Sequence, residues 1–496
     1  MARYTKAQWE KLSSNVSLKN QAFINGKFVD SIKGDTFECI NPSNNRVLTN
    51  VSSCDGKDVD IAVTAARESF EKGYWSNASP TERKKVLIKL SELIMDNLDE
   101  LSVLDSIDMG KTTEDTSTYD IPGASEILQW TAEAADKIMD EIAPTEKNNL
   151  AMIKKVPLGV VGAVVPWNYP LDMAMWKCAP ALACGNSVVL KPAEQSPLSA
   201  LRFAELAIEA GLPEGVLNVV PGFGETAGKA IGMHHDIDIV AFTGSTEVGK
   251  LFLEYSGKSN MKQVWLECGG KSPNIIFNGC SDLKTASQLA AQGGFFNQGE
   301  VCSANSRILV QSDIVDEFLS LLKIEAKNWL SGDPLDPNSS IGSLVSTEHA
   351  KKVKKFIEKA KSETELVFEG EIIGTIKSDN FVSPTIFRDN SGTKEISVDE
   401  VFGPVLSVIP FKDENEAISI ANNSKYALAA SIWTDNLSQA HRVSDKVHAG
   451  TVSVNTMDAF SPMTPFGGFK QSGFGNDLSI HSFDKYTGLK TVWIKY

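Results

Sequence analysis

Apolar residues recur along the chain with two different periods, and the change of period divides the chain into sections. From Asp58 to about Ala143 they recur at helical spacing, as at Leu87, Leu90 and Ile94, so we expect this section to be helical. Ahead of it, Asn25-Gly26 lies between two short apolar runs, a pattern typical of a β-hairpin.

The middle of the chain alternates continuous apolar runs with helical stretches. The helices expected here include Pro197–Ala210, which Gly211 should end, and Thr246–Tyr255. Strands that are apolar on both faces and alternate with helices predict a parallel sheet covered on both sides, with ligands at the carboxyl ends of its strands. The expected strands are Val160–Val165, Ser187–Leu190, Val216–Val220, Ile239–Phe242 and Val264–Leu266.

A second α/β section runs from about Gly270 to Asn455. Its expected strands are Asn274–Phe277, Arg307–Val310, Val405–Ile409, Ala429–Trp433 and Thr451–Val454. The last residues, Leu489–Tyr496, read as an apolar terminal strand. Because an open strand edge pairs readily with another chain, we expect a homotetramer or a homodimer.

Composition narrows the class of protein. The 496 residues suit two or three domains, and a net charge of −15 argues against nucleic acid or an anionic membrane as partner. The longest apolar stretch, Val156–Trp167, is too short to span a bilayer, so we expect a cytoplasmic protein without membrane contact. Seven cysteines without a Cys-x-x-Cys pair indicate free thiols, and the six histidines offer no metal-binding spacing, so no metal is expected.

Two segments carry candidate chemistry for covalent catalysis. Cys302 lies among small residues, and Glu267 precedes the Gly269-Gly270 turn. A thiol nucleophile and a carboxylate base form a pair that suits covalent catalysis. Taken singly, each has an ordinary alternative, because free cysteines are usually buried and most glutamates lie on the surface.

Glycine-rich turns follow two of the expected strands. The segment Phe242–Leu251 nearly matches a phosphate loop but ends in leucine where a hydroxyl is needed, and Pro221–Gly228 is one residue off the dinucleotide fingerprint. Asn168, Lys191 and Glu194 follow two further strands. Polar groups at neighbouring strand ends together indicate a nucleotide crevice, although each motif alone also reads as a plain turn.

In this order the motifs resemble those of the aldehyde dehydrogenase superfamily over nearly the whole chain, from Phe23–Phe28 to Pro465–Gly473. Within the family the chain most resembles the γ-glutamyl-γ-aminobutyraldehyde dehydrogenases of putrescine degradation, through Asp120–Ala124, Asn260–Glu267 and Pro465–Ile494. The resemblance implies an α/β fold: a Rossmann-like parallel-sheet NAD-binding domain (20–135 and 158–268), an α/β catalytic domain (269–470) and a small β oligomerisation element (136–157 and 480–496).

The resemblance also implies a mechanism. The Cys302 thiolate would attack the aldehyde, the Cys302 N–H and the Asn168 amide would form the oxyanion hole, and Glu267 would activate water to hydrolyse the thioester. Glu194 would repel a 2′-phosphate, so we expect NAD rather than NADP. The cofactor-binding residues expected from the resemblance are Val165, Pro166, Trp167, Lys191, Glu194, Gly224, Phe242, Gly244, Ser245, Val248, Glu400 and Phe402.

Two residues depart from the family pattern, and the substrate is less determined. Glu300 replaces a common glutamine and is expected to point away from the thiol; Cys268 replaces an apolar residue and is expected to fill space, with oxidative pairing to Cys302 as the alternative. We expect an ω-amino or γ-glutamylamino aldehyde as substrate, because two acids lie among the candidate pocket residues. These residues are Asp120, Met173, Trp176, Phe296, Met457, Asp458 and Phe460.

Other functions remain open at this point. Within the family the alternatives are oxidation of betaine aldehyde, of a broad range of aliphatic aldehydes, or a CoA-acylating variant, against which Glu267 argues as the water activator. Outside the family's chemistry, a thiol hydrolase or esterase would need Cys302 and Glu267 without a cofactor. A non-catalytic binding protein would leave both residues unused.

Overall fold

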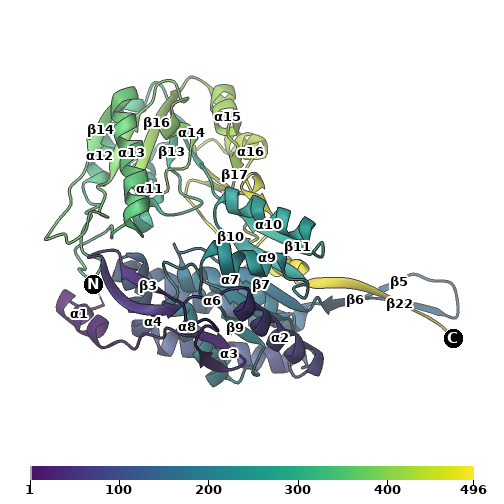
Figure 1. Cartoon of the computed structure of the whole chain (residues 1–496). Coiled ribbons are helices and arrows are strands. Elements are labelled where there is room, and N and C mark those ends of the chain that lie inside the picture. Colours follow the sequence, from purple (N-terminus) through teal and green to yellow (C-terminus); the bar gives the residue numbers. More distant parts are fainter. Residues whose placement is uncertain (1–2) are drawn as a thin grey trace.

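The computed structural model describes residues 3–496 and consists of two α/β bodies and a projecting β arm (Figure 1). Each body is built on one large sheet, with helices against the sheet. The α/β class with a parallel nucleotide-type sheet, a second α/β body and a small β element is confirmed. Among the described residues, no helix is both long and apolar enough to cross a bilayer.

The first body holds an eight-stranded sheet whose five central strands are parallel. All five strands expected in the middle of the chain are present, and so is the hairpin around Asn25-Gly26. In order across the sheet the strands are β2 (Lys27–Val29), β1 (Ala22–Ile24), β9 (Leu217–Val219), β8 (Ser187–Lys191), β7 (Val160–Val164), β10 (Ile239–Thr243), β11 (Gln263–Glu267) and β21 (Gly473–Phe474).

Helices cover both faces of this sheet because alternate strand residues point to opposite sides. Val160 and Val240 pack toward α2 (Gly56–Lys72), α9 (Lys229–Met233) and α10 (Thr246–Lys258). Val161 and Ile239 pack toward the other layer, which contains α3 (Pro80–Asp96), α6 (Ile121–Ala134), α7 (Pro170–Ala183) and α8 (Leu198–Ala210). Gly211 ends α8 with φ +104°, a left-handed conformation that suits glycine.

The expectation of helix from Asp58 to about Ala143 is wrong at its end. Helices α4 (Leu98–Met109) and α5 (Thr113–Asp115) and a π-helical turn, η1 (Thr116–Asp120), fill most of the section beside α2, α3 and α6. Its last residues instead form strand β5 (Glu141–Ala143), which pairs with β6 (Asn149–Pro157). That pairing takes place outside the core, where burial does not impose a clear apolar period.

The chain changes direction across the first sheet between β7 and β10. It runs from β7 outward through β8 to β9, and then returns to the other side of β7 for β10 and β11. The connections that leave the carboxyl ends of β7 and β10 therefore diverge and leave room for a ligand. Asn168 and Ser245 follow these two strand ends.

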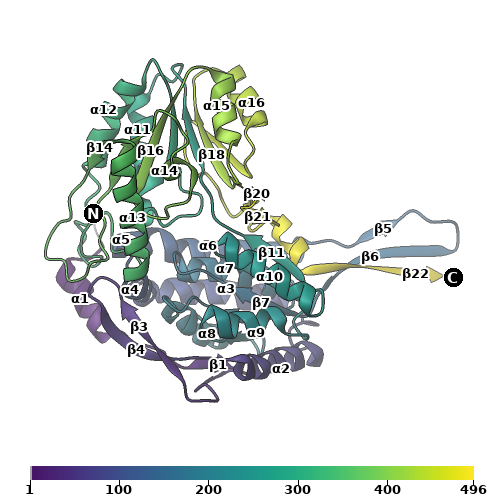
Figure 2. The same cartoon turned by 45° about the horizontal axis from the view of Figure 1, so that its top comes forward.

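The second body holds a seven-stranded sheet that is parallel except at β14. Its five expected strands are all present. The order is β14 (Glu365–Glu369), β15 (Thr385–Arg388), β16 (Val405–Phe411), β13 (Arg307–Gln311), β12 (Pro273–Ile276), β18 (Ala429–Trp433) and β19 (Thr451–Val454). Figure 2 shows its helices, among them α11 (Leu283–Phe295), α12 (Val315–Ala326), α13 (Thr347–Glu363), α14 (Glu395–Val398), α15 (Glu414–Asn422) and α16 (Leu437–Lys446).

The remaining elements are short or peripheral. Helix α1 (Lys6–Asn15) packs on α4, and β3 (Thr36–Asn41) pairs with β4 (Arg46–Ser52). β17 (Tyr426–Ala427) pairs with β20 (Phe469–Lys470).

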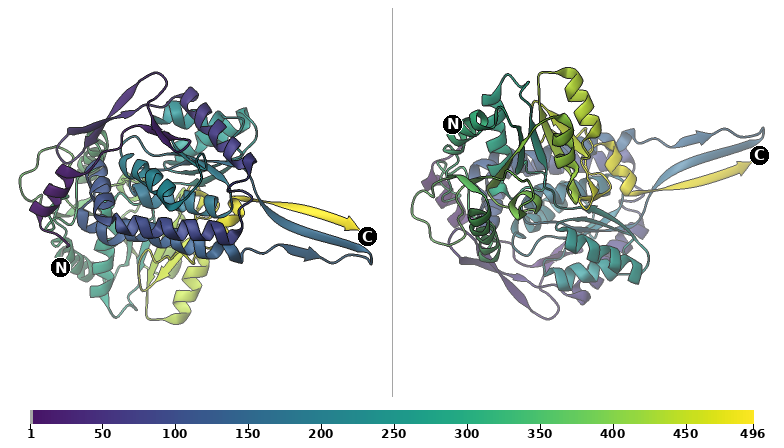
Figure 3. Two further views of the ribbon diagram at one scale, coloured as in Figure 1. Left: turned by 90° about the horizontal axis from the view of Figure 1, so that it is seen from below. Right: turned by 90° about the horizontal axis from the view of Figure 1, so that it is seen from above.

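The arm consists of three antiparallel strands and extends away from both bodies in each view of Figure 3. The expected terminal strand is present as β22 (Thr487–Lys495), which pairs with β6 along its whole length and has an open edge. Leu489 and Trp493 are 73% and 61% exposed on it. The residue boundaries of the expected domains stay a prediction, as does the oligomeric role of this arm.

Candidate active site

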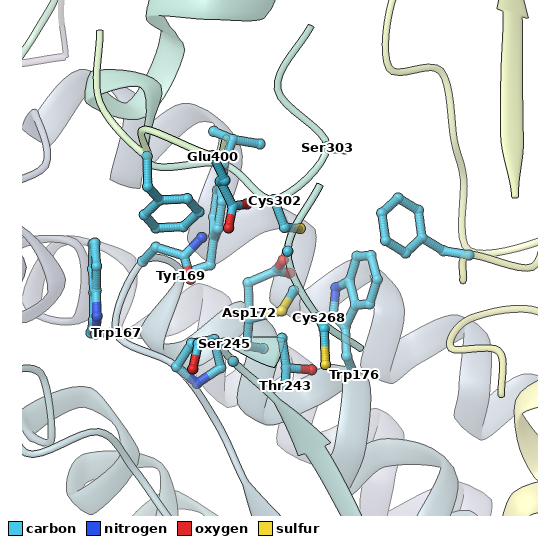
Figure 4. A pocket seen from close by; sticks show the side chains of 18 of the residues that line it. Trp167, Tyr169, Asp172, Trp176, Thr243, Ser245, Cys268, Cys302, Ser303 and Glu400 are labelled. Carbon is cyan, nitrogen blue, oxygen red and sulfur yellow. The ribbon is translucent and has the colours of Figure 1, made fainter. Parts of the chain in front are cut away.

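A cavity of about 290 Å³ lies where the carboxyl ends of β7 and β10 meet the loop that carries Cys302 (Figure 4). Asn168 follows β7, Ser245 follows β10, and Cys302 and Glu400 come from the second body. The strand order explains the position, because the connections after β7 and β10 diverge at this edge of the sheet. The cavity therefore combines a nucleophile with the ends of a nucleotide-type sheet.

The Cys302 loop is held in an unusual backbone conformation. Asn297, Gln298 and Gly299 have consecutive positive φ values of 50°, 58° and 69°. A Cβ atom added to Gly270 would lie 2.4 Å from the Cys302 carbonyl oxygen, so the Gly-Gly turn is needed for the loop to approach closely. This explains why a glycine pair lies beside the candidate nucleophile.

Asn168 is fixed against the same loop. Its side-chain Nδ2 donates to the backbone carbonyl of Glu300 at 2.8 Å. In return, the side-chain Nδ2 of Asn297 donates to the backbone carbonyl of Asn168 at 2.9 Å. A carboxamide nitrogen carries two hydrogens, so the second hydrogen of Asn168 remains for a ligand. Since Asn168 and Cys302 both line the cavity, this arrangement suits the oxyanion that forms on a carbonyl oxygen when the Cys302 sulfur attacks the carbonyl carbon.

Glu267 ends β11 with both carboxylate oxygens buried and without hydrogen-bond partners. Its side chain is not among those that line the cavity. Close by, the Asp477 carboxylate accepts hydrogen bonds from both Lys177 and Lys485. Burial raises the pKa of Glu267 well above its usual range, and Asp477 adds to this while the two lysines oppose it.

Burial also raises the pKa of the Cys302 thiol, with smaller contributions from Asp458 and Glu267. Glu300 points away from the thiol, because its carboxyl group accepts from the Val345 N–H at 3.2 Å and from the Gln298 amide. Cys268 is a free thiol that lies beside Gly249 of α10 and lines the same cavity as Cys302, so oxidative pairing of the two thiols stays an open alternative. A Cβ atom on Gly249 would lie 3.0 Å from its sulfur, so a small side chain fits here.

Nine of the twelve expected cofactor residues fall into two groups. Pro166, Trp167, Gly244, Ser245, Glu400 and Phe402 line the cavity. Lys191, Glu194 and Gly224 lie apart, where the Lys191 ammonium donates to Glu194 Oε2 at 3.2 Å and its aliphatic part lies beside Gly228 of the turn η3 (Gly224–Gly228). Phe242 is buried in β10, Val165 is buried directly after β7, and Val248 is exposed on α10.

These two groups fit the two halves of a dinucleotide. The Ser245 side chain caps α10, so a helix N-terminus faces the crevice, and the Thr243 hydroxyl is buried in the cavity without a partner. Open space surrounds Gly224, where no atom lies within 4 Å of an added Cβ. The Glu400 carboxylate, which accepts from the Gly270 N–H at 2.9 Å, lies at the Cys302 end, and burial raises its pKa to about 7.

The expected substrate residues are only partly brought together. Met173, Trp176, Asp458 and Phe460 line the cavity, and Trp176 and Phe460 meet edge to face at 5.8 Å. Asp120, Phe296 and Met457 do not line it.

The structure gives a reason for each of these three positions. Asp120 is fully buried in an ion pair of 2.5 Å with Lys111. The Phe296 ring packs on Tyr119 instead, and Met457 lies beside Gly293.

Several lining residues were not expected from the sequence. They include Tyr119, Asp172, His349, Lys352 and Phe466. For Asp172 a signal was present, because it is an acid in a helix whose other residues, apart from Lys177, are apolar and include Met173 and Trp176. His349 and Lys352 lie on α13, whose distance along the chain from the motifs concealed them.

Comparison with known proteins finds the same family over nearly the whole chain. The model of the "Aldehyde dehydrogenase family" matches residues 28–492. The chain is 47% identical to the NADP/NAD-dependent aldehyde dehydrogenase PuuC of Escherichia coli K12 over 98% of both chains.

Solved structures agree. An indole-3-acetaldehyde dehydrogenase in complex with NAD+ is 48% identical with a TM-score of 0.97, covering 99% of this chain and 100% of that one. A γ-glutamyl-γ-aminobutyraldehyde dehydrogenase from Burkholderia cenocepacia J2315 is 47% identical, with the same TM-score and coverage.

Proposed function

The chain belongs to the aldehyde dehydrogenase family, and we propose that it oxidises an ω-amino or γ-glutamylamino aldehyde to the carboxylate, with NAD as the oxidant. Oxidation of an aldehyde with NAD(P) is the activity of the family. The substrate, the preference for NAD and the roles of individual residues are our proposal. The observation that carries it is the cavity in which Cys302 and Asn168 share a wall with the ends of β7 and β10.

In this mechanism Cys302 forms the covalent bond to substrate. Its sulfur attacks the aldehyde carbon, and the carbonyl oxygen becomes an oxyanion that the Asn168 amide and the Cys302 N–H stabilise. Asn297 positions Asn168 through the 2.9 Å hydrogen bond to its carbonyl. Because burial raises the pKa of the Cys302 thiol, its proton must leave as the bond from sulfur to carbon forms, and Glu267, once turned toward Cys302, would accept it and release it to solvent before the hydrolysis step.

The bound dinucleotide would supply the hydride acceptor that converts the Cys302 adduct into a thioester. Glu267 would then take a proton from water as the water attacks this thioester and the Cys302 thiolate leaves. Since Glu267 does not line the cavity, its side chain must turn toward Cys302 for this step. Its free carboxylate oxygens have no hydrogen bonds to lose in that movement.

Two observations support the finer parts of the proposal. The Glu194 carboxylate, which accepts from the Lys191 ammonium, supports the preference for NAD, because in the proposed role of holding the adenine ribose it would repel the extra phosphate of NADP. Two acids in the cavity, Asp172 and Asp458, suit a substrate that carries a positive charge.

We further propose a cytoplasmic homotetramer or homodimer assembled through the arm, whose open-edged strand β22 carries exposed apolar residues.

One assay tests the function. The protein is mixed with NAD or NADP and a panel of amino, N-acylamino and plain aliphatic aldehydes, and NADH or NADPH is followed by absorbance with and without CoA. We expect NADH formation without CoA, with the largest kcat/KM for an ω-amino or γ-glutamylamino aldehyde. Ester hydrolysis without any reduction of NAD would instead favour a thiol hydrolase.

A further inference from the structure

Asp172 places a buried carboxyl group in the cavity without a charged partner. It lies in the first turn of α7 and is 7% exposed, and Figure 4 shows its side chain pointing into the cavity. Its Oδ1 has no hydrogen-bond partner. An acid in a first turn interacts favourably with the helix dipole, but this does not require a buried and unpaired oxygen. Such an oxygen costs free energy unless a ligand supplies the partner.

Asp172 lies at the junction of two hollows. A second hollow of about 230 Å³, here called the outer hollow, is lined by Gly123, Glu126 and Pro462 among others. Tyr119, Asp172 and Phe460 line both the outer hollow and the Cys302 cavity. Gly123 of the outer hollow lies close to the unpaired oxygen, because a Cβ atom on Gly123 would lie 3.6 Å from Asp172 Oδ1.

The charges around this junction are acidic. Asp458 in the same cavity accepts from the Ser303 hydroxyl at 2.8 Å through Oδ2, while its Oδ1 has no partner. Burial raises the pKa of Asp172 well above its usual range and Asp120 adds to this, while Lys111, although paired with Asp120, opposes it, so a bound ammonium group would favour the ionised form of Asp172. Asp458 lies beside the nucleophile through Ser303, whereas Asp172 lies toward the outer hollow. Each acid therefore offers a carboxylate oxygen without a partner, Asp458 beside the Cys302 loop and Asp172 at the junction of the two hollows.

We propose that Asp172 binds the ammonium group of the substrate and so determines specificity for cationic over neutral aldehydes. The substrate would enter through the outer hollow, with its aldehyde reaching Cys302 and its ammonium remaining at Asp172. A charge-assisted hydrogen bond to Oδ1 would satisfy the unpaired oxygen. This inference rests on the proposed amino aldehyde function and assigns its specificity to a residue outside the motifs.

The test compares two aldehydes that differ only by an ammonium group, 3-aminopropionaldehyde and propionaldehyde, with the full-length enzyme and NAD. In Asp172→Asn we expect kcat/KM for 3-aminopropionaldehyde to fall about 10- to 100-fold, and that for propionaldehyde to stay within about twofold. The control is Glu133→Gln, which removes the same charge from the exposed face of α6. This control variant should leave kcat/KM unchanged for both aldehydes.

A second measurement does not depend on turnover of an amino aldehyde. Propylammonium should inhibit propionaldehyde oxidation by competition, and Asp172→Asn should weaken this inhibition by a similar factor, while 1-propanol should show no such difference. If the wild type prefers 3-aminopropionaldehyde but Asp172→Asn lowers both activities equally, the role of Asp172 is refuted and the proposed function stands. If the wild type shows no preference for any amino or acylamino aldehyde, the proposed substrate class itself fails.

Discussion

A substitution of Asp120 tests whether this residue binds substrate or stabilises the fold, because the sequence suggests a substrate contact and the structure shows a buried ion pair. Both Asp120 and Lys111 are 0% exposed, and the carboxylate lies 2.5 Å from the ammonium group. In Asp120→Asn, Lys111 would keep its charge inside the protein without its partner. Removal of one member of a buried pair typically costs about 3–5 kcal/mol.

The structure indicates the lower end of this range. The Lys111 ammonium also lies 3.5 Å from the centroid of the Tyr169 ring, and a cation–π contact of this kind retains some compensation for the charge. We therefore expect Asp120→Asn to lower the free energy of unfolding by about 3 kcal/mol. The double variant Lys111→Met/Asp120→Leu, which removes both charges, should recover most of this loss.

The assay is urea unfolding followed by intrinsic fluorescence, with KM measured on the same preparations. The exposed Glu133→Gln change serves as a control and should shift the free energy of unfolding by less than about 0.5 kcal/mol. KM for amino and plain aldehydes should change in parallel in Asp120→Asn. Unchanged stability together with a selective rise in KM for the amino aldehyde would refute the structural role and make Asp120 a substrate ligand.

Three further predictions concern the cofactor, the base and the buried acids. Glu267→Gln should release one equivalent of NADH per active site in a rapid burst, measured by stopped flow, and then turn over about 10²–10⁴-fold more slowly; the absence of a burst would argue against a role in deacylation. Because the pKa of Glu267 is raised, kcat of the wild type should also fall as the pH is lowered, with the fall beginning well above pH 4.5. Glu194→Gln should lower KM for NADP by about tenfold relative to KM for NAD, since a like charge is removed; an unchanged ratio would place the 2′-hydroxyl elsewhere. Burial raises the pKa of Asp115 from 3.8 to about 7, so the folded state holds this proton longer than the unfolded state and stability falls as pH rises between these values. Asp115→Asn should accordingly be more stable than the wild type at pH 8 by a few kcal/mol at most, with a gain that shrinks toward pH 5 in urea unfolding; a constant gain would exclude titration as the cause.

The five strands expected in each body were predictable because burial on both faces leaves a continuous apolar run, whereas β14 and β15 were not among them. β18 and β19 begin and end at the residues expected. The end of the helical section was not predictable, because β5 is a strand only through its pairing with β6 in the arm. The apolar period of β5 does not indicate its pairing with β6, because this pairing buries little apolar surface.

Site residues in motifs that end a strand were predictable from the sequence. Site residues on helices were less predictable, because the rotation of the helix determines whether a side chain points into the cavity. Asn168 and Ser245 follow strands β7 and β10, whose neighbouring position follows from the strand order. Asp120 and Asp172 are both acids near the start of a helix, and only the structure shows that Lys111 neutralises the first and leaves the second in the cavity. The roles assigned to the motif residues stay predictions.

The three left-handed residues before Cys302 have a consequence for how the enzyme would lose activity on heating. Asn297 and Gln298 pay a conformational cost of the order of 1 kcal/mol each, and the Asn297 amide holds them through its bonds to the Asn168 and Glu300 carbonyls. When these few hydrogen bonds break, relief of the backbone strain favours a change in the conformation of this loop, whereas the strands of the two large sheets contain no such strain. Inactivation should therefore precede the loss of circular dichroism, as a local event in an otherwise intact protein.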